Sequence, residues 1–125
     1  MKKKSRVAET ELLVQQIISG LREKKGKHIV TLDLRKIDNA VSDFFVVASG
    51  DSNTHVDALA GSVEYMVRKE LNDKPWHIEG TTNAEWVLMD YVNVVVHIFQ
   101  RDPREHYNIE GLWADAITKE YDEVA

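Results

Sequence analysis

The chain has 125 residues, of which 43% are hydrophobic and 30% charged, so it fits one soluble globular domain and is too short for two ordinary ones. The absence of cysteine excludes a disulfide framework and thiolate chemistry, and it suits the cytosol. The formal net charge of -5 disfavours nucleic acid as the main partner and favours a basic partner protein.

The sequence shows no sign of membrane insertion or export. No apolar run reaches the length that a bilayer span requires. The basic start MKKKSR is not followed by an apolar stretch, which argues against a signal peptide, and residues 1–6 are expected to be disordered. We therefore expect a cytoplasmic protein without membrane contact.

A first helix is predicted from Val7 to Lys25. Its apolar residues recur at helical spacing and form one stripe: Leu13, Val14, Ile17, Ile18 and Leu21. Gly26 is the predicted C-terminal stop, and the basic residues just before it complement the helix dipole.

Two strands are predicted next, at His28–Leu34 and Asp43–Ser49. The second is almost continuously apolar, which is typical of a strand buried on both faces. The turn Gly50–Asn53 then opens a second helix, with Ser52 or Asn53 as its N-cap. A glycine turn of this kind can bind phosphate, but without a Walker lysine or a GxGxxG series an ordinary turn is favoured.

Three more strands are predicted at residues 76–80, Trp86–Tyr91 and Val94–Phe99. Asp102 then offers an N-cap with Pro103 at the first helical position.

A final helix is predicted from Ile109 to Tyr121, where apolar residues again recur at helical spacing. The element order is αββαβββα. It predicts a single α/β sandwich domain over residues 1–125, with a mixed and roughly five-stranded sheet.

The last two strands are predicted to form a hairpin around the turn Val92-Asn93, which pairs Leu88 with His97. Residues that pair directly share one face of a sheet. The core face is then apolar throughout: Val87, Met89, Tyr91, Val94, Val96 and Ile98. The other face is amphipathic: Trp86, Leu88, Asp90, Val95, His97 and Phe99. Valine disfavours the positive φ of such turns, so a register shifted by one residue is the alternative.

Three interpretations of the diagonal pair Asp90 and His97 stay open. A histidine beside a carboxylate is the usual arrangement of a general base, but no nucleophile is identified and the histidines lack metal-ligand spacing. A structural interpretation makes Asp90 the hydrogen-bond partner of His97 within the sheet. An interaction surface is favoured, because residue types that dominate binding hot spots gather beside this face: Trp86, Arg104, Tyr107 and Trp113.

Fragments of this segment form a combined pattern: Trp86-x-x-x-Asp90, Val95-Val96-His97 and Arg104-x-x-Tyr107-x-x-Glu110-x-Leu112-Trp113. Earlier fragments agree, namely Asp43–Ser49 followed by Gly50-x-Ser52-x-x-His55, and Glu79-Gly80 with Asn83-x-x-Trp86. Together they resemble the signature of the ribosomal silencing factor family (RsfS), also called the Iojap family. The resemblance covers roughly Leu12 to Ala116, and the combination is specific although each fragment alone is weak.

The resemblance implies an α/β fold related in topology to nucleotidyltransferases and a protein that needs no cofactor. It also implies binding to the fourteenth protein of the large ribosomal subunit (uL14), which would sterically block the small subunit and damp translation when nutrients are scarce. Separately from the resemblance, a homodimer is expected in the absence of that partner if the face that carries Trp86 and His97 is apolar enough to self-associate. Carried over position by position, the resemblance implies contact or contact-supporting roles for these residues: Trp86, Asp90, His97, Arg104, Tyr107, Leu112 and Trp113.

The alternative function is a cryptic nucleotide-binding or nucleotidyltransferase-like enzyme. Such enzymes hold magnesium with paired carboxylates one residue apart on a strand. Asp33 is followed by Leu34-Arg35 and Asp90 by Tyr91-Val92, so neither strand carries the pair. Because kinship of fold does not carry activity, a protein without enzymatic activity is expected.

Overall fold

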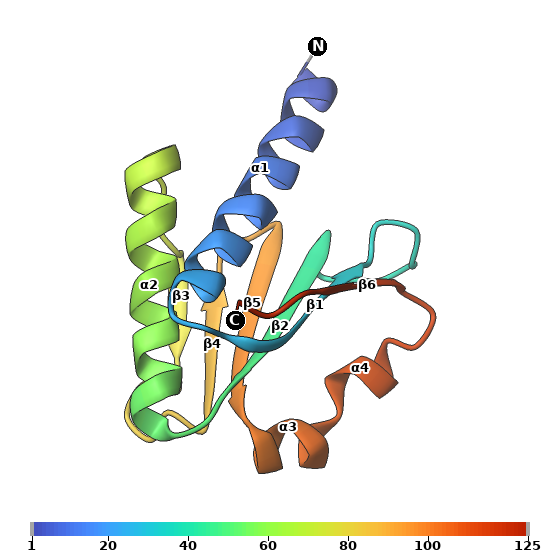
Figure 1. Ribbon diagram of the computed structural model, residues 1–125. Helices are drawn as coiled ribbons and strands as arrows, with labels where there is room; N and C mark the ends of the chain where they lie inside the picture. Colours follow the sequence, from blue (N-terminus) through green and yellow to red (C-terminus); the bar gives the residue numbers. More distant parts are fainter. Residues whose placement is uncertain (1, 125) are drawn as a thin grey trace.

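Helices pack against a mixed β-sheet in this protein (Figure 1). The structure is a computed structural model that describes residues 2–124, with side chains described from residue 8 onward. In chain order the elements are α1 (Lys2–Glu23), β1 (Lys27–Asp33), β2 (Phe44–Gly50), α2 (Asn53–Leu71), β3 (His77–Glu79), β4 (Trp86–Asp90), β5 (Val94–Gln100), α3 (Arg101–Tyr107), α4 (Ile109–Leu112) and β6 (Ile117–Tyr121).

Within the described residues the sheet has six strands in the order β3-β4-β5-β2-β1-β6. Neighbouring strands are antiparallel except β2 and β5, which run parallel at the centre. All seven residues of β2 are buried, as its continuous apolar run predicted. The predicted α/β class with a mixed sheet is confirmed, and the sheet has one strand more than the five expected.

The prediction of a helix from Ile109 to Tyr121 is wrong. In its place the four-residue helix α4 is followed by β6, which pairs antiparallel with β1. Asn108 adopts a left-handed conformation (φ 46°) and separates α4 from α3. Without β6, the backbone N–H and C=O groups on the outer edge of β1 would lack hydrogen-bond partners. Pairing with β1 therefore outweighs the short helical pattern of apolar residues that predicted a helix here.

Helix α3 also begins earlier than predicted, with Gln100 rather than Asp102 as its N-cap. Two bonds fix Gln100: its backbone N–H donates to the Glu85 carbonyl (2.9 Å) and its Nε2 to the Ala84 carbonyl (3.1 Å). Pro103 consequently lies in the first turn of α3. Backbone N–H groups in the first turn have no acceptor within the helix, so the lack of an N–H in proline costs no helical hydrogen bond.

Helix α1 starts at Lys2, before the predicted start at Val7. Of the segment 1–6 expected to be disordered, Met1 and all side chains lie outside the described residues, so that expectation stays a prediction. At the other end Lys25 is left-handed (φ 59°), and the Gly26 N–H donates to the Leu21 carbonyl (2.8 Å). This is a Schellman-type end in which Lys25 takes the left-handed position just before the predicted stop at Gly26.

The larger core lies where α1 and α2 cover one face of the sheet (Figure 1). The apolar stripe of α1 is buried there as predicted, together with the inner face of α2 and the predicted core face of the hairpin. Ser52 caps α2, because its Oγ accepts a hydrogen bond from the His55 N–H at 3.1 Å. Asn72 ends α2 in a left-handed conformation.

His55 joins the end of α1 to the start of α2. Its Nδ1 accepts from the Asp51 backbone N–H (2.9 Å), so the neutral ring carries its proton on Nε2, which donates to the Lys24 carbonyl (2.8 Å). The Asp51 N–H before α2 and the His55 N–H in its first turn are therefore both engaged by the protein itself. This supports the sequence-based preference for an ordinary turn over a phosphate loop.

Gly20 is where α1 and α2 cross most closely. A Cβ atom at Gly20 would lie 2.9 Å from the Val63 Cα and 3.0 Å from the Ser62 carbonyl oxygen, both rigid backbone atoms. Ser62 Oγ also donates to the Gly20 carbonyl at 2.7 Å. The missing side chain thus permits the close approach of the two helices.

We expect Gly20→Ala to lower the free energy of unfolding by about 1–2 kcal/mol, because overpacking at the crossing outweighs the gain in helix propensity. Gly61→Ala on α2 is the matched control, since a Cβ there meets nothing within 4 Å. It should raise stability by up to about 1 kcal/mol. Urea denaturation of both variants measures the difference, and two changes of the same sign would contradict the close crossing.

Candidate docking surface

The predicted register of the β4–β5 hairpin is confirmed, with Leu88 paired to His97. Val92 does adopt a positive φ (77°), which is strained for a β-branched residue. Asp90 helps to hold this turn, because its Oδ1 accepts a hydrogen bond from the Val92 N–H at 2.7 Å. The turn thus keeps the predicted register despite its unfavourable valine.

The face of the sheet opposite α1 and α2 is here called the second face. Its buried residues form a second apolar cluster: Val30, Leu32, Leu34, Phe45, Val47, Val95, Phe99 and Ile109. The short helices α3 and α4 lie on this side, away from the two long helices (Figure 1). Trp86, Leu88 and Trp113 pack against the cluster and stay half-buried, so the second face is covered less completely than the first.

His97 is buried in the second face, with 4% of its surface exposed. Its Nδ1 accepts a hydrogen bond from the Trp86 indole Nε1–H at 3.2 Å. Because an indole nitrogen only donates, the neutral ring must carry its proton on Nε2. Within the described residues this Nε2 has no hydrogen-bond partner. Burial lowers the pKa of His97 to about 4, so the ring is neutral at pH 7.

The proposed hydrogen bond between Asp90 and His97 is not formed. Asp90 Oδ1 is engaged with the Val92 N–H, and Trp86 occupies Nδ1 of His97 from the opposite diagonal. The structural interpretation of His97 was therefore right about burial and wrong about the partner. A general base needs a carboxylate or another group that orients it toward a nucleophile, and the surroundings of His97 are aromatic.

Trp86 is the centre of an aromatic cluster on the second face. Its ring stacks on Phe99 (centroids 4.9 Å apart) and contacts Tyr107 of α3 (4.6 Å). Phe45 of β2 lies edge-on to His97 at 4.6 Å and to Trp113 at 5.9 Å. Residues from β2, β4 and β5 and from the segment 101–113 are thus brought together on the second face. Phe45 was missed because its place beside the hairpin depends on the parallel pairing of β2 with β5.

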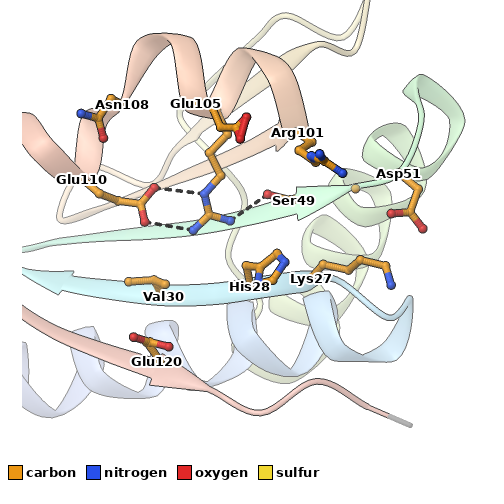
Figure 2. Close-up of a pocket in the computed structure, with 12 residues that line it drawn as sticks. Lys27, His28, Val30, Ser49, Asp51, Arg101, Glu105, Asn108, Glu110 and Glu120 are labelled. Carbon is orange, nitrogen blue, oxygen red and sulfur yellow. Dashed lines mark hydrogen bonds and ion pairs between the residues drawn. The ribbon is translucent and has the colours of Figure 1, made fainter.

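Arg104 holds the α3–α4 segment to the sheet rather than facing outward. Its Nε and Nη2 donate to the two carboxylate oxygens of Glu110 (3.0 and 3.1 Å), and its Nη1 donates to the Ser49 Oγ at 2.7 Å (Figure 2). The Arg104 side chain is only 12% exposed. Its geometry therefore fits a positioning role. Glu110 and Ser49, its partners, were absent from the predicted site residues.

We expect Arg104→Ala to lower the free energy of unfolding by about 1–2 kcal/mol, because the hydrogen bonds to Glu110 and Ser49 are lost while the Glu110 carboxylate, 34% exposed, keeps part of its hydration. The double variant Arg104→Met, Glu110→Leu should recover part of this loss. Urea denaturation gives the free energies, and hydrogen exchange should show faster exchange of amides in α3 and α4. A double variant no more stable than Arg104→Ala would contradict the ion-pair explanation.

The remaining predicted site residues differ in exposure. Tyr107 is 50% exposed and Leu112 is 76% exposed, which is high for residues of this size. Trp86 and Trp113 are half-buried beside them. These four residues are called the docking row below: Trp86, Tyr107, Leu112 and Trp113. Asp90 is half-buried on the same face of the sheet, further along β4.

The described residues contain no group of three or more His, Cys, Asp or Glu side chains that could hold a metal ion. Asp33 pairs instead with Arg35 at 2.8 Å, and hydrogen bonding to this guanidinium lowers the pKa of Asp33. Nor does any helix in the described range reach the length and apolar character that crossing a membrane requires.

A family model described as "Ribosomal silencing factor during starvation" matches residues 7–125. The chain belongs to the ribosomal silencing factor family. A member of this family, the ribosomal silencing factor RsfS of Halalkalibacterium halodurans, is 37% identical over 112 residues, covering 90% of this chain and 94% of the relative. The resemblance found in the sequence is thereby confirmed.

The three-dimensional comparison agrees with this membership. A crystal structure of a protein from Chromobacterium violaceum has a TM-score of 0.78 and 38% identity, covering 83% of this chain and 85% of that one. This chain also has a more distant relative in mouse. That protein is named mitochondrial assembly of ribosomal large subunit protein 1. It is 29% identical over 105 residues, which are 80% of this chain and 44% of the relative.

Proposed function

We propose that this chain regulates translation in the cytoplasm by binding the large ribosomal subunit through uL14. Bound there, it blocks the small subunit sterically and damps translation when nutrients are scarce. The mechanism is one of occupancy and involves no chemical step. Family membership supports the ribosome as the target.

The observation on this chain that carries a docking role is the exposure of the docking row. Leu112 and Tyr107 are 76% and 50% exposed, next to two half-buried tryptophans. Exposed apolar residues with tryptophan and tyrosine anchors are typical of protein interfaces. In this proposal Tyr107, Leu112 and the tryptophans supply buried apolar area.

Charge supports a basic partner. Asp90 has one carboxylate oxygen, Oδ2, without a hydrogen bond inside the described residues. It would meet a basic group of the ribosomal protein, and the net charge of -5 favours approach to a basic surface. His97 supports the contact from beneath by holding the Trp86 indole, and Arg104 supports it by holding the segment that carries Leu112.

Co-sedimentation with isolated large subunits tests the proposal. The chain should pellet with large subunits, and increasing small-subunit concentration should displace it, because the two compete for one surface. Purified uL14 in solution should compete for the chain as well. Binding to whole ribosomes that is undiminished by small subunits would refute steric blocking, while failure of uL14 to compete would refute that partner.

We further propose that the docking row pairs two copies of the chain when no ribosome is present. Apolar surface that is exposed in the monomer is buried by self-association at sufficient concentration. Analytical ultracentrifugation should then show a mass that rises with concentration and falls when uL14 is added. A monomer mass that is independent of concentration would remove this part of the proposal.

A further inference from the structure

A cavity lies at the carboxyl ends of the two central parallel strands. β2 and β5 run side by side, and the chain leaves β2 into α2 on the first face but leaves β5 into α3 on the second face. Neighbouring parallel strands that continue to opposite faces create a crevice at their ends, and ligands of open α/β sheets bind there. The cavity at this place has a volume of about 590 Å³.

Three cations and four carboxylates are among the described residues that line this cavity, and of these only Arg104 and Glu110 form an ion pair with each other. Lys27 extends from β1, and Arg101 from the start of α3, toward the same end of the cavity (Figure 2). Within the described part of the chain neither makes an ion pair shorter than 4.0 Å, and the same holds for Glu105 and Glu120. The Asp51 carboxylate lies at that end of the cavity as well, so charges of both signs face the same space (Figure 2).

Arg104 adds hydrogen-bond donors to the wall of the cavity. A guanidinium has five N–H groups, and three of those of Arg104 donate hydrogen bonds to Glu110 and Ser49. The side chain is only 12% exposed and lines the cavity, so the ion pair fixes its remaining N–H groups in place. His28 adds an exposed imidazole ring at the mouth, where its positive φ of 49° marks a bulge in β1.

We propose that this cavity binds a small phosphorylated nucleoside. Lys27 and Arg101 supply the charge that a phosphate group requires, with the fixed guanidinium of Arg104 beside them. Glu105 and Glu120 are acceptors suited to the hydroxyl groups of a ribose, as carboxylates are in other crevices of this kind. The face of the His28 ring, whose Nδ1 lies 3.7 Å from the Glu123 carboxylate, is a surface on which the base can stack. The volume fits a ligand of mononucleotide size.

This site is separate from the docking row and does not depend on the proposed function. The cavity and the docking row both use residues of α3. Arg101, Arg104 and Glu105 line the cavity, while Tyr107 contacts Trp86. Binding in the cavity involves no bond making or breaking.

Titration of the ¹⁵N-labelled chain with AMP, GMP, CMP and UMP in metal-free buffer tests the site. At least one mononucleotide should produce saturable shifts in the amide signals of residues 49–51 and 101–108. The corresponding nucleoside and inorganic phosphate should each bind at least tenfold more weakly. Saturable binding of none of the four overturns the proposal, and phosphate binding as tightly as the nucleotide overturns the nucleoside assignment.

The double variant Lys27→Glu, Arg101→Glu should weaken binding at least tenfold while its other amide signals stay in place. Arg68→Glu, Lys69→Glu on the exposed side of α2 makes the same change in net charge and should bind as the unmodified chain does. Equal losses in both variants would show that net charge alone attracts the ligand, and would overturn the cavity as its site.

Discussion

A Tyr107→Ala, Leu112→Asp variant is expected to bind isolated large ribosomal subunits about 100-fold more weakly than the unmodified chain. Leu112 is 76% exposed and Tyr107 is 50% exposed, so neither contributes much to the core. An interface anchor that is truncated costs about 2 kcal/mol or more, and a carboxylate placed in an apolar contact adds a desolvation cost. Two such losses exceed the roughly 2.7 kcal/mol that corresponds to a 100-fold weaker affinity.

The matched control carries the same chemical changes on the helical side of the molecule. Tyr65 on α2 is 64% exposed and Leu12 on α1 is 46% exposed. Tyr65→Ala, Leu12→Asp should leave binding within about twofold of the unmodified chain, since effects this small are usual away from hot spots. Thermal unfolding of both variants checks that each is folded. Equal losses of binding in the two variants would place the contact elsewhere.

The second large effect concerns pH and the buried His97. Its pKa is about 4 in the folded chain, against an ordinary value of 6.5 for the unfolded chain. Between these two pKa values the unfolded chain binds more protons than the folded chain does, so the free energy of unfolding falls as pH falls through this range. Above pH 6.5 the contribution of His97 to stability is fully present. We expect His97 to contribute a loss of roughly 3 kcal/mol between pH 7 and pH 4.

Urea denaturation at pH 7 and at pH 4.5 measures this loss, with His97→Gln as the test variant. A glutamine oxygen can still accept from the Trp86 indole and does not titrate, so its loss over the range should be smaller by about 2–3 kcal/mol. His77→Gln is the control, because the His77 side chain is 53% exposed. A control variant that loses as much pH dependence as His97→Gln would remove the assignment to His97.

The strand alternation of the hairpin was readable from sequence because it is local. Residues 86 to 99 contain both strands and their turn, so a period of two fixes each face without knowledge of the rest. The partner of His97 was not readable, because Trp86 and Asp90 lie on its two diagonals at similar distance. The outcome depends on Val92, whose strained turn engages the Asp90 carboxylate and leaves Trp86 as the partner.

Other features were hidden because they join distant parts of the chain. Arg104 reaches Ser49 across 55 positions, and this bond exists only because β2 lies parallel to β5. The motif therefore predicted that Arg104 matters without showing that it holds the α3–α4 segment. Strand β6 is a similar case, since nothing near Ile117 in the sequence indicates the free edge of β1.

The position of β6 has a consequence for the folding of the chain during synthesis. β1 pairs with β6 across about 90 residues, from Ile29 to Tyr121, and β6 follows every other described element along the chain. Until residues 117–121 emerge from the exit tunnel, β1 is an outer strand with unpaired backbone groups, which is a template for pairing with other chains. A nascent chain stalled before Ile117 should therefore aggregate more readily than one that includes β6.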